Sequence, residues 1–179
     1  MMNLKANILD REVYSGEFTC GVKKIDEFVQ SSYIENITQH AMAIEVTDNE
    51  TIIGYCMINF KNIFLERMPD DTADYNTDLI KYCTSAHIQY IAVDKSKQKK
   101  KYGTKIIAYV IKYILSFVEK LPIRLITLDA FKELVEWYKK IGFRIIGEEE
   151  DYSNEDTVAM YYDCLTKKNR NKLDNYELV

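Results

Sequence analysis

A buried strand, a lysine-rich loop and an amphipathic helix follow one another between Ile88 and Ser116. The strand IQYIAV is apolar and β-branched, whereas the loop DKSKQKKKYGTK is too charged to be buried. After Gly103, apolar residues recur at helical spacing. The first N–H groups of that helix and the positive end of its dipole face the loop, and diphosphate is the usual biological anion for such a site. Further positive charge comes from Lys99, Lys100, Lys101 and Lys105.

The wording of this stretch resembles the acyl-CoA-binding motif of the GNAT N-acetyltransferases. In that family a strand ending in Ala-Val-Asp is followed by Gln/Arg-x-x-Gly-x-Gly/Ala at the start of a helix. Here the strand ends with 92–94, Ala-Val-Asp, and the motif continues with Gln98 and Gly103. Lys101 stands where the family has glycine, and we expect it to offer its N–H with a negative φ. The alternative to a cofactor motif is a plain strand–loop–helix crossover.

A second sequence motif, Trp137-Tyr138-Lys-Lys-Ile-Gly142-Phe143, also resembles GNAT enzymes. The family carries Phe/Tyr-Tyr-x-x-x-Gly-Phe after its fifth strand. The pattern predicts a helix from Phe131 that stops at Gly142, with glycine as a left-handed cap. Two motifs in the family's order identify the chain as a GNAT member from about Phe18 to Tyr162.

The resemblance implies acetyl-CoA as cosubstrate and roles for individual residues, without a metal. Tyr138 takes the place of the general acid that protonates the leaving thiolate; the alternative is a core aromatic. His87 stands where some family members carry a basic glutamate; the alternatives are a histidine without a chemical role and a base supplied by water. The pantetheine arm is expected to pair with the backbone of Ile91, Ala92 and Val93. The diphosphate is expected to meet Gln98, Lys99, Lys100, Lys101, Tyr102, Gly103 and Thr104.

Composition is that of a globular domain, with 47% hydrophobic and 29% charged residues among 179. No apolar run predicts a membrane span and no signal-peptide pattern is present. The four scattered cysteines and two histidines favour neither a disulfide framework nor a zinc site, which suits a cytoplasmic protein. The formal net charge of −4 argues against a generic nucleic-acid binder, although a local basic patch can act alone.

The remaining pattern predicts a mixed α/β fold. Strands are expected over 4–9, 41–46, 52–60, 123–128, 144–146 and 158–164, with a hairpin turn at 48–50 and a first helix around 25–32. The family resemblance implies a mostly antiparallel central sheet, flanked by helices and splayed at the acetyl-CoA site. We expect one acetyltransferase domain over 1–165 and a polar tail over 166–179. Residues 61–85 carry an acidic run, either a solvated insertion or a wall that favours cationic amines.

The predicted reaction is transfer of acetyl from acetyl-CoA to a primary amine. The acceptor is left open among a small amine, a protein amine and aminoacyl-tRNA. The motif Phe18-x-Cys20-Gly21-x-x-x-Ile25-Asp26-x-Phe28 resembles acetyltransferase toxins that act on aminoacyl-tRNA. An antitoxin partner and a homodimer are left open as partners. A CoA-sensing module and a nucleic-acid-binding module are the non-enzymatic alternatives.

Overall fold

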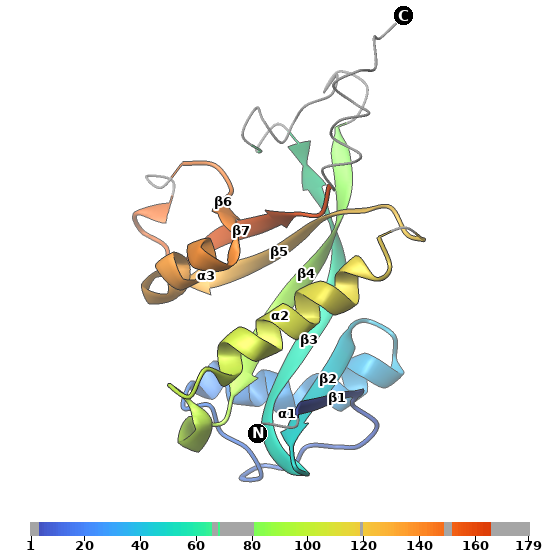
Figure 1. Cartoon of the computed structure of the whole chain (residues 1–179), viewed down its shortest axis with the longest axis vertical. Coiled ribbons are helices and arrows are strands. Elements are labelled where there is room, and N and C mark those ends of the chain that lie inside the picture. The colour runs from blue at the N-terminus through green and yellow to red at the C-terminus, as the bar shows by residue number, and fades with distance from the viewer. Residues whose placement is uncertain (1–3, 66–67, 69–80, 119, 149–151, 166–179) are drawn as a thin grey trace, which may run out of the picture. The chain divides into compact units, whose positions relative to one another are not determined.

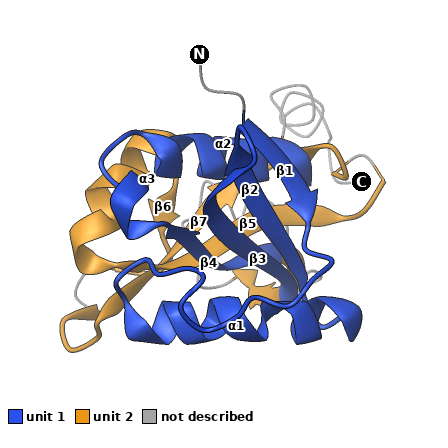
Figure 2. Ribbon diagram, turned by 90° about the horizontal axis from the view of Figure 1, so that it is seen from below, with its two compact units in different colours: residues 1–61, 86–114 blue, residues 62–85, 115–179 orange. Residues whose placement is uncertain are grey.

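The computed structural model describes residues 4–65, 68, 81–118, 120–148 and 152–165. The chain divides into two compact units (Figure 2). Unit 1 comprises residues 1–61 and 86–114, and unit 2 comprises residues 62–85 and 115–179. Most of the acidic run predicted between 61 and 85, and the polar tail after 165, lie outside the described residues.

Unit 1 is built on strands with one helix on each side of them (Figure 2). Its strands are β1 (Leu4–Ile8), β2 (Met42–Asp48), and parts of β3 (Thr51–Phe64) and β4 (Tyr82–Val93). The two helices are α1 (Lys23–Ile37) and α2 (Tyr102–Leu115). β1 pairs antiparallel with β2, and β2 with β3. The predicted hairpin turn between β2 and β3 is confirmed, and Asn49 and Glu50 both have a positive φ there.

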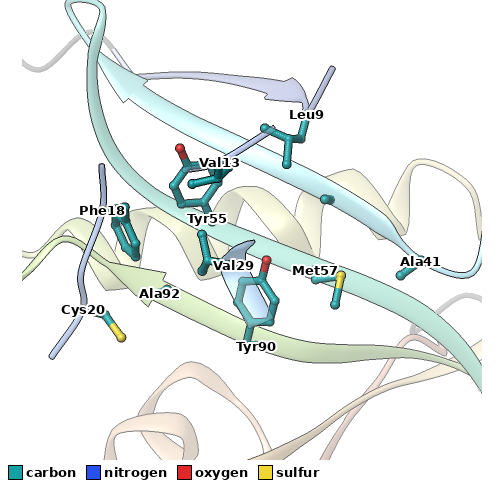
Figure 3. Close-up of a cluster of buried hydrophobic side chains, with 11 residues drawn as sticks. Leu9, Val13, Phe18, Cys20, Val29, Ala41, Tyr55, Met57, Tyr90 and Ala92 are labelled. Carbon is teal, nitrogen blue, oxygen red and sulfur yellow. The ribbon is translucent and has the colours of Figure 1, made fainter. Parts of the chain in front are cut away.

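The alternation of side chains along β3 directs its residues to the two helices. Tyr55 and Met57 join the hydrophobic core beneath α1, to which Val29 of that helix contributes (Figure 3). Gly54 faces the other way, because a Cβ built on it would lie 3.2 Å from Ile106 of α2. The sequence pattern of α2 is confirmed, since its apolar positions are the buried ones. They are Ile106, Ile107, Val110, Ile111 and Ile114.

Unit 2 contains β5 (Ile123–Phe131), η3 (Lys132–Leu134), α3 (Val135–Ile141), β6 (Arg144–Ile145) and β7 (Thr157–Asp163). β5 and β7 run antiparallel. The prediction that a helix begins at Phe131 is wrong, because Phe131 still pairs with Thr157 at the end of β5. One cluster of buried core residues in this unit comprises Leu65, Met68, Leu125, Ile146 and Tyr161.

Within the described residues, seven strands are hydrogen-bonded in the order β1-β2-β3-β4-β5-β7-β6 (Figure 1). The helices and this sheet confirm the predicted mixed α/β class. None of the helices in the described part of the chain is long and apolar enough to cross a bilayer.

Candidate active site

The loop that follows β4 is folded by its own polar residues. The Asp94 N–H donates to the Ile53 carbonyl at 2.8 Å, which continues the pairing of β4 with β3 by one residue. The Asp94 carboxylate then accepts the Ser96 N–H at 2.9 Å and starts the short helix η2 (Lys95–Lys97). The Asp94 carbonyl accepts the N–H groups of Lys97 and Gln98 at 2.8 and 3.1 Å. The loop therefore leaves the strand in one defined direction.

Gln98 uses its side-chain amide within the protein. Its Nε2 donates to the Cys20 carbonyl at 2.7 Å and to the Val93 carbonyl at 3.1 Å. The Lys95 N–H donates to the Thr19 carbonyl at 2.9 Å. The loop is thus attached to the segment that precedes α1. The prediction that Gln98 binds the cofactor stays a prediction, and in the structure its Nε2 joins the loop to Cys20.

Two lysines of the loop adopt the left-handed conformation. Lys99 and Lys101 have φ values of 60° and 64°. The expectation of a negative φ at Lys101 is therefore wrong: this residue takes the backbone shape for which the family uses glycine. Left-handed residues alternating with right-handed ones form nests, in which successive N–H groups converge on an anion. Each lysine costs about 1–2 kcal/mol in that conformation.

α2 begins directly after this loop, at Tyr102. The first N–H groups of a helix have no partner within it and carry the positive end of its dipole. The Tyr102 hydroxyl donates to the Asp48 carboxylate at 2.9 Å, and this hydrogen bond raises the pKa of Tyr102. The helix start is thereby tied to the hairpin between β2 and β3. Gly103 brings no side chain to the first turn, so its backbone is open to a phosphate.

The charge of the chain is segregated toward this region. Residues 94–116 contain seven lysines and one aspartate, a net charge of +6. The whole chain carries −4, so the remainder carries −10. The Lys100 ammonium donates to the Ser96 carbonyl at 3.0 Å and so lies over the loop itself. The loop, the start of α2 and these lysines together fit a diphosphate with additional phosphate groups.

The C-terminal end of β4 approaches β3 very closely. A Cβ built on Gly54 would lie 2.1 Å from the Ala92 carbonyl oxygen, a distance that no side chain can tolerate. Gly54 therefore marks a close backbone approach, as its position in a strand pattern suggests. Ala92 is buried, and its neighbours Ile91 and Val93 are half-buried. These are the three residues predicted to pair with the pantetheine arm.

His87 belongs to unit 1 and is only 5% exposed. It lies within a run of four buried residues of β4, from Ser85 to Ile88, as in a strand covered on both faces. A buried imidazole is shielded from solvent and can act only on a group brought directly to it or through an ordered water.

Tyr138 belongs to unit 2, on α3, and is 8% exposed. Its ring packs edge-on against Trp137, with centroids 4.6 Å apart, and against Phe143, at 5.6 Å. The helix ends at Gly142, whose φ of 112° confirms the predicted left-handed cap. The Phe143 N–H then returns to the Tyr138 carbonyl at 3.1 Å. These contacts hold the ring in one orientation, as a positioned acid requires.

Comparison with known proteins shows the family of the chain. Residues 40–145 match the family described as the acetyltransferase (GNAT) domain, which is more than half of the chain. The chain belongs to this family, and it is an N-acetyltransferase whose acetyl donor is acetyl-CoA. No curated protein sequence matches it.

Several solved structures share the fold over nearly the whole chain. A structure described as a bacterial toxin has a TM-score of 0.75 at 17% identity, covering 100% of this chain and 99% of that one. AtaT complexed with acetyl-methionyl-tRNAfMet has a TM-score of 0.74 at 18% identity, with 96% and 99% covered. A tyrosine-to-phenylalanine mutant of KacT has a TM-score of 0.74 at 15% identity, with 96% and 98% covered.

Proposed function

We propose that the chain transfers the acetyl group of acetyl-CoA to the α-amino group of an aminoacyl-tRNA. The observation that carries this choice of acceptor is the basic outer face of α2. Lys105, Tyr109 and Lys112 are exposed on it, with Tyr109 stacked on Tyr113 at 6.1 Å. From Tyr102 to Lys112 the helix α2 rises by about 15 Å, which exceeds the length of one diphosphate. Lysines with stacked aromatic rings suit a nucleic acid.

The similarity to toxin structures supports the same acceptor. The structure of AtaT complexed with acetyl-methionyl-tRNAfMet shares the fold over 96% of this chain. An α-amine also suits the chemistry, because its pKa of about 7.7–8.0 leaves roughly a tenth of it neutral at pH 7, whereas a lysine amine with a pKa of about 10.4 is less than about a thousandth neutral. A weak base is then sufficient.

In the proposed reaction the neutral amine attacks the thioester carbonyl of acetyl-CoA. The nitrogen lone pair forms the C–N bond while the C–S bond breaks, and the electron pair of that bond stays on sulfur. The Tyr138 hydroxyl gives its proton to the thiolate. The amine loses a proton to His87 or to water, and solvent returns a proton to the tyrosine. The first turn of α2 and the loop from Lys99 to Thr104 bind the diphosphate, and residues 91–93 position the pantetheine arm.

Transfer of labelled acetyl to purified charged tRNA tests the proposal. Labelled acetyl-CoA is incubated with the enzyme and either aminoacyl-tRNA, deacylated tRNA, or a polyamine. We expect label on aminoacyl-tRNA alone, at the α-amine. Turnover of the polyamine with aminoacyl-tRNA left unlabelled would replace tRNA by a small cationic acceptor. The family assignment would then stand, and the acceptor proposal would fall.

An antitoxin partner and a homodimer belong to the same proposal. The structure of a tyrosine-to-phenylalanine mutant of the AtaT toxin bound to the C-terminus of the antitoxin AtaR shares the fold of this chain at 17% identity. We place the reaction in the cytoplasm, which holds both substrates, and the four cysteines carry free thiols in the structure. Expression of the chain alone should arrest growth, and the Tyr138→Phe variant should not. Normal growth with active enzyme in the cell would contradict a toxin role.

A further inference from the structure

A carboxylate of α1 organises the segment that braces the loop after β4, residues 94–103. Asp26 Oδ1 accepts the Cys20 N–H at 2.8 Å, and its Oδ2 accepts the Thr19 hydroxyl at 2.7 Å. The Thr19 hydroxyl in turn accepts the Gly21 N–H at 3.1 Å. Burial opposes ionisation of Asp26, but the hydrogen bonds from Cys20 and Thr19 outweigh it and hold its pKa below the ordinary value. One side chain thus fixes three successive residues, Thr19 to Gly21.

The other side of this segment faces the loop after β4. Its carbonyl groups are the acceptors already described, Thr19 for the Lys95 N–H and Cys20 for the Gln98 amide. The two loops are therefore connected through two short hydrogen bonds, Lys95 to Thr19 and Gln98 to Cys20, between residues 76 and 78 positions apart in the chain. The two segments are also in van der Waals contact at Gly21, since a Cβ built there would lie 3.6 Å from Lys95 Cδ. Gly21 has a φ of 88°, so another residue would be strained there.

We propose that Asp26 is a positioning residue for acetyl-CoA binding, acting through Thr19, Cys20 and Gln98 on the loop from Lys95 to Gly103. The loop holds two left-handed lysines at a cost, so it needs external contacts to keep that shape. The segment from Thr19 to Gly21 supplies such contacts, and Asp26 fixes the segment. The inference rests on the proposal that this loop binds the diphosphate.

The chain offers a matched control for Asp26 on the same helix. Glu27 carries the same charge one residue later, but its side chain is 61% exposed and its ion pair, with Lys23 at 3.8 Å, is long. Asp26→Asn and Glu27→Gln therefore remove one negative charge each from almost the same place. Only the first removes the carboxylate that holds Thr19 and Cys20. A comparison of the two separates positioning from a general change in charge.

Calorimetric titration of the full chain with acetyl-CoA tests the inference. We expect Asp26→Asn to raise Kd about tenfold, corresponding to the loss of hydrogen bonds to a charged group. Thr19→Val should act likewise, Thr19→Ser should restore affinity, and Glu27→Gln should match the wild type. If Asp26→Asn does not fold, the two Thr19 variants carry the test. Equal affinity of Thr19→Val, Thr19→Ser and wild type would overturn the inference.

A double variant distinguishes positioning from an unrelated structural effect. If Asp26 acts through Gln98, Asp26→Asn with Gln98→Ala should be no weaker than the weaker single variant. If the increase in Kd of the double variant equals the product of the two single increases, Asp26 does not act through Gln98, and the proposed route from Asp26 to the loop is overturned. Gly103→Val tests the underlying site and should weaken binding more than tenfold. If Gly103→Val has no effect, the loop is not the diphosphate site. If it weakens binding while Asp26→Asn does not, the inference about Asp26 alone fails.

Discussion

Replacement of Lys101 by glycine should stabilise the protein, although it removes a charged side chain near the proposed diphosphate site. Lys101 has a φ of 64°, a conformation that costs a lysine about 1–2 kcal/mol and glycine almost nothing. Glycine adds entropy to the unfolded chain, which offsets about 0.5–1 kcal/mol of this gain. The net expectation is a stabilisation of about 0.5–1 kcal/mol. For a chain of this size that corresponds to a rise in Tm of about 1–4 °C.

Thermal unfolding of three variants measures this effect. Lys100→Gly is the matched control, because it removes the same charge at the neighbouring position but relieves no backbone strain, since Lys100 does not have a positive φ. This variant should lower Tm. Lys101→Ala removes the charge and keeps the strain, so its Tm should stay near or below that of the wild type. A Tm of Lys101→Gly at or below that of Lys100→Gly would refute the reasoning.

The same Lys101→Gly variant separates backbone from side-chain binding. One screened surface charge contributes about 0.2–1 kcal/mol, so the acetyl-CoA Kd should rise no more than about fivefold. If the lysine side chain itself were essential, the loss would exceed tenfold and would vary steeply with salt. Titration at two ionic strengths distinguishes these results.

Three further predictions concern other parts of the chain. Gly54→Ala should lower the free energy of unfolding by about 1–3 kcal/mol, because its Cβ would meet the Ala92 carbonyl; wild-type stability in denaturant unfolding would contradict this close approach. His87→Ala should flatten the acid limb of the profile of kcat/KM against pH if His87 is the base, and an unchanged limb would indicate that water accepts the proton of the amine. Because folding lowers the pKa of Asp26, its contribution is present above the unfolded carboxyl pKa and lost as pH falls. The difference in Tm between wild type and Asp26→Asn should therefore close below about pH 4. A difference that widens there would contradict a lowered pKa of Asp26 in the folded chain.

The elements that carry the site could be predicted because their signals are local. Helical spacing gave the buried face of α2, and glycine at the end of a helical pattern gave the cap at Gly142. The end of β5 could not be placed, because Phe131 is held in the strand by its pairing with Thr157, far along the chain. The local sequence around Phe131 fits both the end of a strand and the start of a helix, so the neighbouring residues alone do not distinguish the two.

The backbone of the loop after β4 was predicted wrongly at Lys101 for a related reason. Nothing in a run of lysines indicates which of them has a positive φ, since glycine is the usual sign of that conformation. The role of Gln98 was also hidden, because its partner Cys20 lies in another segment of the sequence. The motif from Phe18 to Phe28 indicated a resemblance to a subgroup of the family. The structural role of its residues depends on hydrogen bonds that form only in the folded chain.

The central claim is acetyl transfer to an aminoacyl-tRNA with Tyr138 as the acid, and its most direct test is the rate of that transfer by the Tyr138→Phe variant. The variant keeps the ring that packs against Trp137 and Phe143 and loses only the hydroxyl. With both substrates saturating, wild-type enzyme should label charged tRNA, and the variant should be slower by about 10²–10⁴-fold with its acetyl-CoA Kd nearly unchanged. Equal rates for the two enzymes, in a single turnover limited by chemistry, would contradict the claim.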